Sequence, residues 1–236
     1  EQAPRWKGLN SFMYAHNWWH LALFYISLGQ PEKVLATYDA HVWGLEKSFA
    51  QDQIGAASLL ARMELAGINV GDRWEDVAKH IAMRGPDTTL PFLTMQYLYA
   101  LGRANSPAAD TLMDAVKAKA HAPSFEQDAW QNVALPACEG LLAHARGEYE
   151  ITVSQLGPAL KRLTEIGGSH AQRDLFAQVH LDALMKTERH EQARKTMERR
   201  LKYDPNGVPL NHMLAEVYEK THLPDKAAEA RARAFL

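Results

Sequence analysis

Two histidines four residues apart, His16 and His20, form the first pattern in this chain that could carry chemistry. On an α-helix both side chains lie on one face, where two imidazoles can chelate a metal ion. Asp39 and His41, on the helix expected to pair with this one, could add ligands. The alternative is that the histidines only hydrogen-bond within the helix pair. Residues 16–20 lack the glutamate of an H-E-x-x-H motif, so we expect no metal and no cofactor.

The second pattern is the stretch Gly-Gly-Ser-His-Ala-Gln-Arg-Asp at residues 167–174. The two glycines are typical of a helix end, and Ser169 with Gln172 predicts a capping box that starts the next helix. The N–H groups of that helix start, together with Arg173, could hold a carboxylate or a phosphate. The candidate anion-binding residues are Ser169, His170, Arg173 and Asp174. The alternative, which we favour, is that the arginine and the aspartate pair with neighbouring helices.

The elements that position these residues recur at a fixed spacing. Ala227 follows Ala193 by 227 − 193 = 34 residues, and the same offset relates Leu184 to Tyr218. A 34-residue period with small and large apolar residues at fixed places is the signature of tetratricopeptide (TPR) helix pairs. Such pairs stack into an open solenoid, because each pair covers the apolar face of its neighbour. The default function of this architecture is binding along a curved surface.

Helix patterns run along the whole chain, and no segment shows the period-two alternation of a strand. The sequence therefore predicts an all-α fold: a TPR-like α-solenoid of about six antiparallel helix pairs with irregular repeats. It forms one domain over residues 1–236, with units starting near residues 15, 53, 88, 133, 174 and 208.

Several residues predict where the helices start and end. Asp72 with Glu75, and Ser124 with Gln127, have the spacing of capping boxes. Gly102 is expected to break the third pair. In the same way, we expect Pro158 to kink or end the second helix of the fourth pair.

The first helix of each pair lines the concave surface of a TPR array. This register predicts a groove that is aromatic and histidine-bearing at its start and acidic at its end. Its residues are His16, Trp19, His20 and Leu23 from the first pair, Phe92, Gln96 and Tyr99 from the third, Leu141 and His144 from the fourth, Gln178 and Asp182 from the fifth, and His212, Glu216 and Glu219 from the sixth. Apolar anchors with a few polar groups suit a peptide or a small molecule.

Composition and charge limit the classes of partner and the location that this chain can have. The 236 residues carry a net charge of −2, which is not the basic field of a nucleic-acid-binding protein. No apolar run approaches the ~20 residues that span a bilayer. Cys138 is the only cysteine, so no disulfide forms within the chain, and we expect a reducing, cytoplasmic location. The chain begins at Glu1 without a methionine, so we expect a trimmed start or a piece of a longer protein.

The two patterns that could carry chemistry lie about four units apart. Since packed helices are ~8–10 Å apart, four steps along a solenoid amount to tens of ångströms. One shared site would then require strong curvature or a dimer. The sequence also lacks a nucleophile elbow, a phosphate-binding glycine loop and a cysteine cluster.

Five strings of residues together resemble a known family. They are residues 16–20 (His-Asn-Trp-Trp-His), 38–41 (Tyr-Asp-Ala-His), 135–139 (Leu-Pro-Ala-Cys-Glu), 146–149 (Arg-Gly-Glu-Tyr) and 166–174 (Ile-Gly-Gly-Ser-His-Ala-Gln-Arg-Asp). The sequence resembles the tetratricopeptide repeat protein 38 family, also called StaR-like, from about residue 10 to 205. The resemblance implies the C-terminal part of a longer helical-repeat protein and no defined activity. Thr94, Met95 and Gln96 stand where that family has Asn-Asp and His.

Our first hypothesis is a non-catalytic binding module that presents a concave groove to a protein segment or a small ligand. The alternative is an enzyme or a metal-dependent accessory protein that uses the two polar clusters. A third hypothesis is homo-oligomerisation through the terminal units, because neither end of the chain has an obvious polar capping helix.

Overall fold

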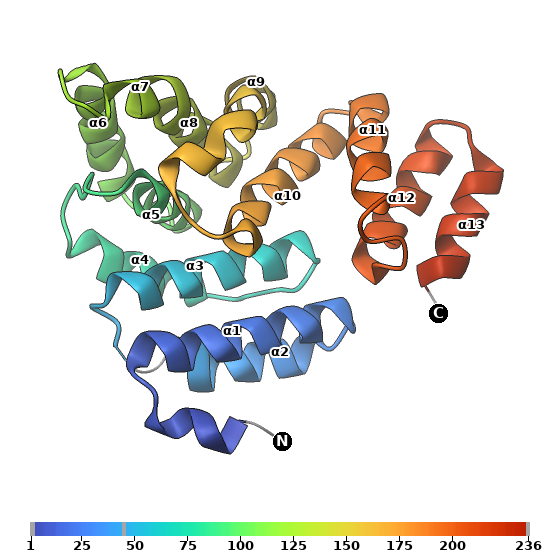
Figure 1. The fold of residues 1–236 in the computed structure, drawn as a ribbon, viewed down its shortest axis with the longest axis horizontal. Coiled ribbons are helices and arrows are strands. Elements are labelled where there is room, and N and C mark those ends of the chain that lie inside the picture. The colour runs from blue at the N-terminus through green and yellow to red at the C-terminus, as the bar shows by residue number, and fades with distance from the viewer. Residues whose placement is uncertain (1–2, 44–45, 235–236) are drawn as a thin grey trace.

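The computed structural model describes residues 3–43 and 46–234, which form helices and connecting turns without a strand (Figure 1). The N-terminal elements are η1 (Ala3–Gly8), α1 (Ser11–Ser27), α2 (Pro31–Thr37), η2 (Tyr38–Val42), α3 (Ala50–Leu65), α4 (Arg73–Ala82), α5 (Pro91–Arg103) and α6 (Ala108–His121). The C-terminal elements are α7 (Gln127–Ala129), η3 (Trp130–Ala134), α8 (Leu135–Ala145), α9 (Tyr149–Ala159), η4 (Leu160–Ile166), α10 (His170–Lys186), α11 (His190–Leu201), α12 (Val208–Lys220) and α13 (Pro224–Ala234). The all-α prediction is confirmed for these residues.

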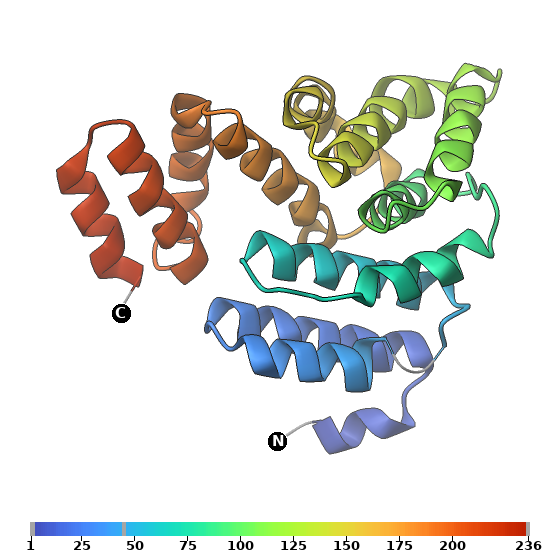
Figure 2. The same cartoon turned by 180° about the vertical axis from the view of Figure 1, so that it is seen from behind.

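Helices that follow one another in the chain pack against one another. α1 packs on α2 and α3, α3 packs on α4 and α5, and α5 packs on α8, which pairs with α9. The chain then turns back, because α10 packs on α9 and also on α3 (Figures 1 and 2). This return contact brings together residues that are far apart in the sequence, such as Arg62 and Ala171.

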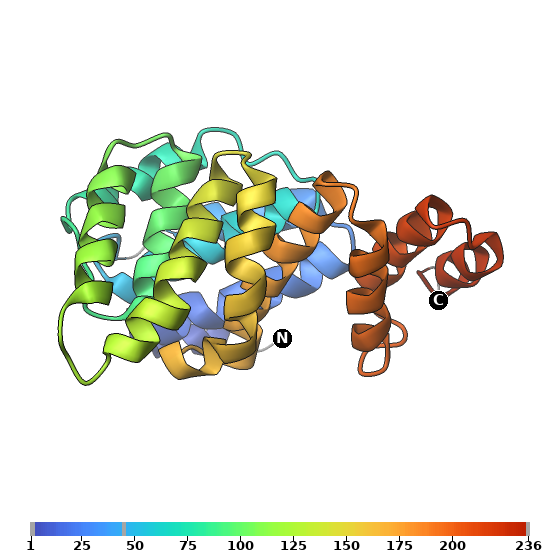
Figure 3. The same ribbon diagram turned by 90° about the horizontal axis from the view of Figure 1, so that it is seen from above.

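The last helices lead away from this curled part of the molecule (Figure 3). α11, α12 and α13 pack in succession. Buried apolar side chains form two clusters that meet on α10: Phe176 and Val179 belong to the first cluster, and Leu181 and Leu184 to the second. The sixth unit was expected to end at Leu236, which lies outside the described residues.

Local sequence explains several helix ends. Pro31 occupies the first turn of α2, where its missing N–H costs nothing. Ser169 and Gln172 form the expected capping box at the start of α10. α9 ends one residue after Pro158, and the chain continues as the 3₁₀-helix η4.

Two predicted capping boxes are wrong. Asp72 is the N-cap of α4, but its ψ of 8° is not the extended backbone that lets a capping side chain reach back, and it makes no such hydrogen bond. The N–H of Glu75 instead bonds the backbone oxygen of Asp72 at 2.9 Å. At the other site, the N–H of Gln127 bonds the backbone oxygen of Ser124, and the helix follows an N-cap at Glu126.

The third pair breaks one residue after Gly102, because α5 ends at Arg103. Gly102 lies inside α5, where an added Cβ would be 2.8 Å from Leu142 Cδ1 and 2.9 Å from Ala145 Cβ. This glycine lets α5 approach α8 closely. The turn between the two helices includes Asn105, which has a positive φ of 50°.

Two π-helical segments, η2 and η3, were not predicted. A π-turn inserts one extra residue into a helix and shifts every side chain that follows it. No helix of the described part is long and apolar enough to cross a membrane.

Candidate functional site

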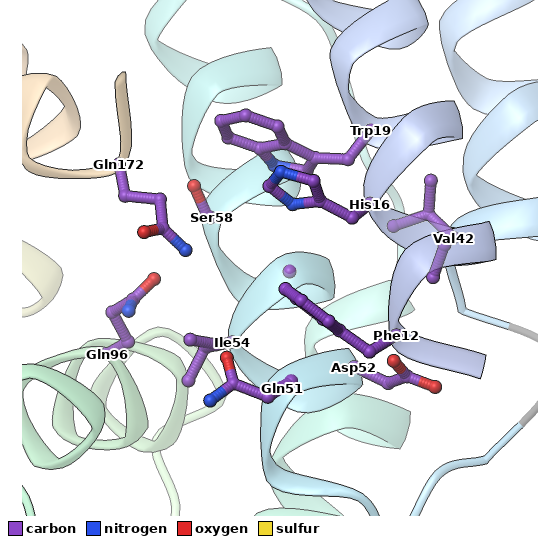
Figure 4. Close-up of a pocket in the computed structure, with 12 residues that line it drawn as sticks. Phe12, His16, Trp19, Val42, Gln51, Asp52, Ile54, Ser58, Gln96 and Gln172 are labelled. Atoms are coloured by element: carbon purple, nitrogen blue, oxygen red, sulfur yellow. The ribbon is translucent and has the colours of Figure 1, made fainter. Parts of the chain in front are cut away.

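A recess opens where α1, α3, α5 and α10 converge (Figure 4). The described residues that line it are Phe12, Ala15, His16, Trp19, Val42, Gln51, Asp52, Ile54, Gly55, Ser58, Gln96 and Gln172. The lining therefore combines residues from both ends of the curled part.

One wall of the recess is aromatic and comes from a single face of α1. Phe12, His16 and Trp19 follow the i, i+4, i+7 spacing that places side chains on one face. The rings of His16 and Trp19 stack nearly parallel, with centroids 5.9 Å apart, and the centroid of Phe12 is 5.1 Å from that of His16. This wall offers a ligand the rings of Phe12 and His16, which are tilted by 36° to one another, while Trp19 is buried beside His16.

The floor of the recess is formed by α3. Gln51, Gly55 and Ser58 again follow helical spacing, so one face of α3 looks into the recess. A Cβ added to Gly55 would meet nothing within 4 Å. Glycine inside a helix costs roughly 0.5–1 kcal/mol relative to alanine, and here it leaves the floor open.

Three lining side chains are buried with a polar atom that has no hydrogen-bond partner in the structure. They are Trp19 (Nε1), Asp52 (Oδ1) and Ser58 (Oγ), and each of these residues is at most 4% exposed. An unsatisfied buried polar group costs about 1–3 kcal/mol. Each of these atoms is closed off from solvent, so a bound molecule reaches it only when the side chains around it shift.

The titratable groups of the recess are shifted by burial. Desolvation raises the pKa of the Asp52 carboxyl, although the hydroxyl of Ser11 donates a hydrogen bond to it. Desolvation lowers the pKa of His16 and of His20, and His20 lowers that of His16 further. The Nε2 atoms of the two histidines are 3.1 Å apart, so one ring donates to the other.

Arg62 joins the two clusters that the sequence places far apart. Its Nη2 donates to the carbonyl oxygen of Ala171 at 2.6 Å, and its Nη1 is 3.6 Å from Oδ2 of Asp174. Its guanidinium carbon also lies 5.6 Å from the ring centroid of Trp19. The expected separation of tens of ångströms is therefore wrong, because the chain curves until α10 packs on α3.

Three of the four candidate anion-binding residues make contacts within the chain. Ser169 caps α10, and Arg173 donates to the carbonyl oxygens of Gly167 and Gly168. Asp174 pairs with Arg62 and with Arg200 and accepts from Gln178. The fourth, His170, is exposed. The contacts of Asp174 fit the packing interpretation of the motif, whereas Arg173 bonds the turn before its own helix, and anion binding stays a prediction.

The four candidate metal ligands do not come together. Asp39 accepts two hydrogen bonds from Arg73, at 2.8 and 2.6 Å. His41 bonds the hydroxyl of Tyr14 at 2.8 Å and stacks on Trp18. Among the residues described, no group of three or more His, Cys, Asp or Glu side chains could hold a metal ion.

Other predicted groove residues are buried between helices. Tyr99, His144 and Asp182 form a hydrogen-bonded chain: the Tyr99 hydroxyl is 3.1 Å from His144 Nδ1, and His144 Nε2 is 2.9 Å from Asp182 Oδ2. Phe92 packs edge-on against Phe176. Leu23 packs half-buried against the core.

The residues that line the recess therefore overlap the predicted groove only in part. His16, Trp19 and Gln96 line it, but Phe12, the α3 floor and Gln172 were missed. The mid-helix Gly55 was the available signal, because glycine is unfavourable there without a reason. The contribution of Gln172 depends on the return of α10, which no local pattern predicts.

No protein-family model and no solved structure matches this chain.

Proposed function

We propose that this protein is a TPR-like binding module in which the recess between α1, α3, α5 and α10 holds a protein segment or a small ligand. The succession of packed helices α1, α3, α5 and α8 supports a solenoid whose first helices lie side by side. The resemblance of the five strings to the StaR-like family points the same way. In this proposal the packing of α10 on α3 shortens the concave side, so that it is an open recess instead of a long groove.

The observation that carries this proposal is the combination of an open floor with unpartnered polar atoms. Gly55 leaves space that any other side chain would fill, and Ser58 and Trp19 each bury a polar atom without a partner beside that space. Close-packed cores avoid unfilled space of this kind. Small-molecule sites consist of such apolar walls with a few polar groups.

The groups present favour binding over covalent catalysis. Burial raises the pKa of the Cys138 thiol strongly, so this side chain is not an activated nucleophile. The nucleophilic residue that lines the recess is Ser58, whose hydroxyl makes no hydrogen bond to a base. The described residues of the recess therefore favour non-covalent binding of a molecule over nucleophilic catalysis.

A fragment screen by ligand-observed NMR tests the proposal when it is run on three proteins. The wild type is compared with Gly55→Leu, which fills the floor, and with Ala118→Leu, which adds the same side chain at an exposed position of α6. Circular dichroism and thermal melts first establish that each variant is folded.

We expect fragments that bind the wild type and Ala118→Leu but not Gly55→Leu. If no fragment of any charge distinguishes Gly55→Leu from the other two proteins, the recess is not a binding site and the proposal fails.

A further inference from the structure

The chemical class of the ligand can be read from two glutamines on opposite walls of the recess. Gln172 accepts a hydrogen bond at Oε1 from the N–H of Ser169 at 2.8 Å, which leaves its NH₂ group to donate. Gln96 donates from Nε2 to the carbonyl oxygen of Phe92 at 3.3 Å, which leaves its Oε1 to accept. Figure 4 shows the two side chains pointing toward one another.

Together these glutamines present one donor and one acceptor at neighbouring places. An amide is complementary to that arrangement, because its carbonyl accepts and its N–H donates. Ser58, on the floor between α1 and α10, can do either. A simple carboxylate or a simple ammonium group can satisfy only one of the two glutamines.

Charge argues against an ionic ligand. Among the described residues that line the recess, none is lysine or arginine, and Asp52 is the one acid. The nearby Arg62 already pairs with Asp174. An anion would lose its hydration without meeting a free cation, and a cation would meet a single carboxylate that already accepts from Ser11.

The aromatic wall indicates which kind of chemical group carries the amide in the ligand. The rings of Phe12 and His16 lie along the recess (Figure 4), and flat rings stack on such surfaces. A planar apolar group would therefore lie against α1 while its amide reaches the glutamines.

We propose that the recess binds an uncharged amide carried on a flat apolar group, recognised by Gln172 as donor and Gln96 as acceptor. This inference rests on the proposed function and adds the class of ligand. Two sources carry this chemistry, a free small molecule and the amide of a peptide with an aromatic side chain.

Three probes of similar size and different charge test the class: benzamide, benzoate and benzylamine. Dissociation constants are measured by NMR titration of the wild type and of Gly55→Leu. We expect benzamide to bind at least about tenfold more tightly than either ion, with the binding lost in Gly55→Leu. N-acetyl-L-phenylalaninamide serves as the peptide arm, and its affinity relative to that of benzamide decides between the two sources.

Gln172→Glu is the matched variant, because glutamate at this position also satisfies a capping box and keeps the start of α10. We expect it to weaken benzamide at least about fivefold and to strengthen benzylamine, while Gln192→Glu, at an exposed position of α11, changes neither. Benzoate or benzylamine binding the wild type as tightly as benzamide would overturn the ligand class and leave the recess as a site. If none of the three probes binds, the inference fails, and the broader fragment screen decides the proposed function separately.

Discussion

The replacement of Gly55 by alanine gives the sharpest test of the open floor. An added Cβ at this position would meet nothing within 4 Å. Glycine inside a helix is less favourable than alanine by about 0.5–1 kcal/mol, because it loses more backbone freedom on folding. We therefore expect Gly55→Ala to raise the free energy of unfolding by about this amount, which for a chain of this size raises Tm by about 1–4 °C.

The same substitution at Gly140 is the matched control. Gly140 also lies within a helix, α8, but its added Cβ would be 2.7 Å from Leu156 Cβ and 2.8 Å from Leu156 N. A backbone atom cannot move aside as a flexible side chain can. Overpacking of this kind costs about 1–3 kcal/mol, so we expect Gly140→Ala to lower Tm despite the better helix propensity.

Thermal melts followed by circular dichroism at 222 nm, with urea titrations for the free energies, measure both variants. The opposite signs of the two shifts are the prediction. A fall in Tm for Gly55→Ala as large as that for Gly140→Ala would show that side chains close over Gly55, and the described recess would not exist in solution.

Three further predictions concern the groups around the recess. Arg62→Leu should lower the free energy of unfolding, measured in urea, by about 1.5–3 kcal/mol, because it removes a charged donor to the Ala171 carbonyl. Arg173→Ala, at a more exposed site, should lower it by less than about 1 kcal/mol. Asp52→Asn should raise Tm at pH 7 but not at pH 3. Burial raises the folded-state pKa of the Asp52 carboxyl, so its contribution to stability is present below the unfolded pKa and is lost as the pH rises through the folded pKa. An equal change in Tm at both pH values would contradict this. Tyr99→Phe should lower the free energy of unfolding by about 0.5–1.5 kcal/mol in the same urea assay, because it removes the hydrogen bond to His144. An unchanged free energy would show that the hydrogen bonds linking Tyr99, His144 and Asp182 add nothing to stability.

Local sequence was sufficient for most of the helices and for some of their ends. Pro31 and the Ser169–Gln172 box work through the nearest turns of backbone, so their effect can be read from spacing alone. Asp72 has the right spacing for a box and still fails, because its backbone adopts a turn that spacing does not reveal. Residue types restrict which capping arrangements a helix end can have, and the backbone dihedral angles determine which of them forms.

The site itself was harder to predict than the helices. The α1 face with His16 and Trp19 follows from helical periodicity, and Gly55 carried a signal that went unused. The placement of Gln96 and Gln172 in one recess could not be predicted, because it depends on the angle by which each helix pair is rotated relative to the pair before it. Small errors in that rotation accumulate along an array, and the π-turn η3 adds another shift before α10.

The proposed site has the buried Trp19 in its wall, next to the space that a ligand would fill. The indole N–H signals of the six tryptophans in a ¹⁵N–¹H spectrum report on this directly, with the Trp19 signal assigned by its loss in Trp19→Phe. Upon titration with benzamide, we predict a shift of the Trp19 signal in the wild type and no shift in Gly55→Leu. An unmoved Trp19 signal at saturating benzamide, or an equal shift in both proteins, would contradict binding in this recess.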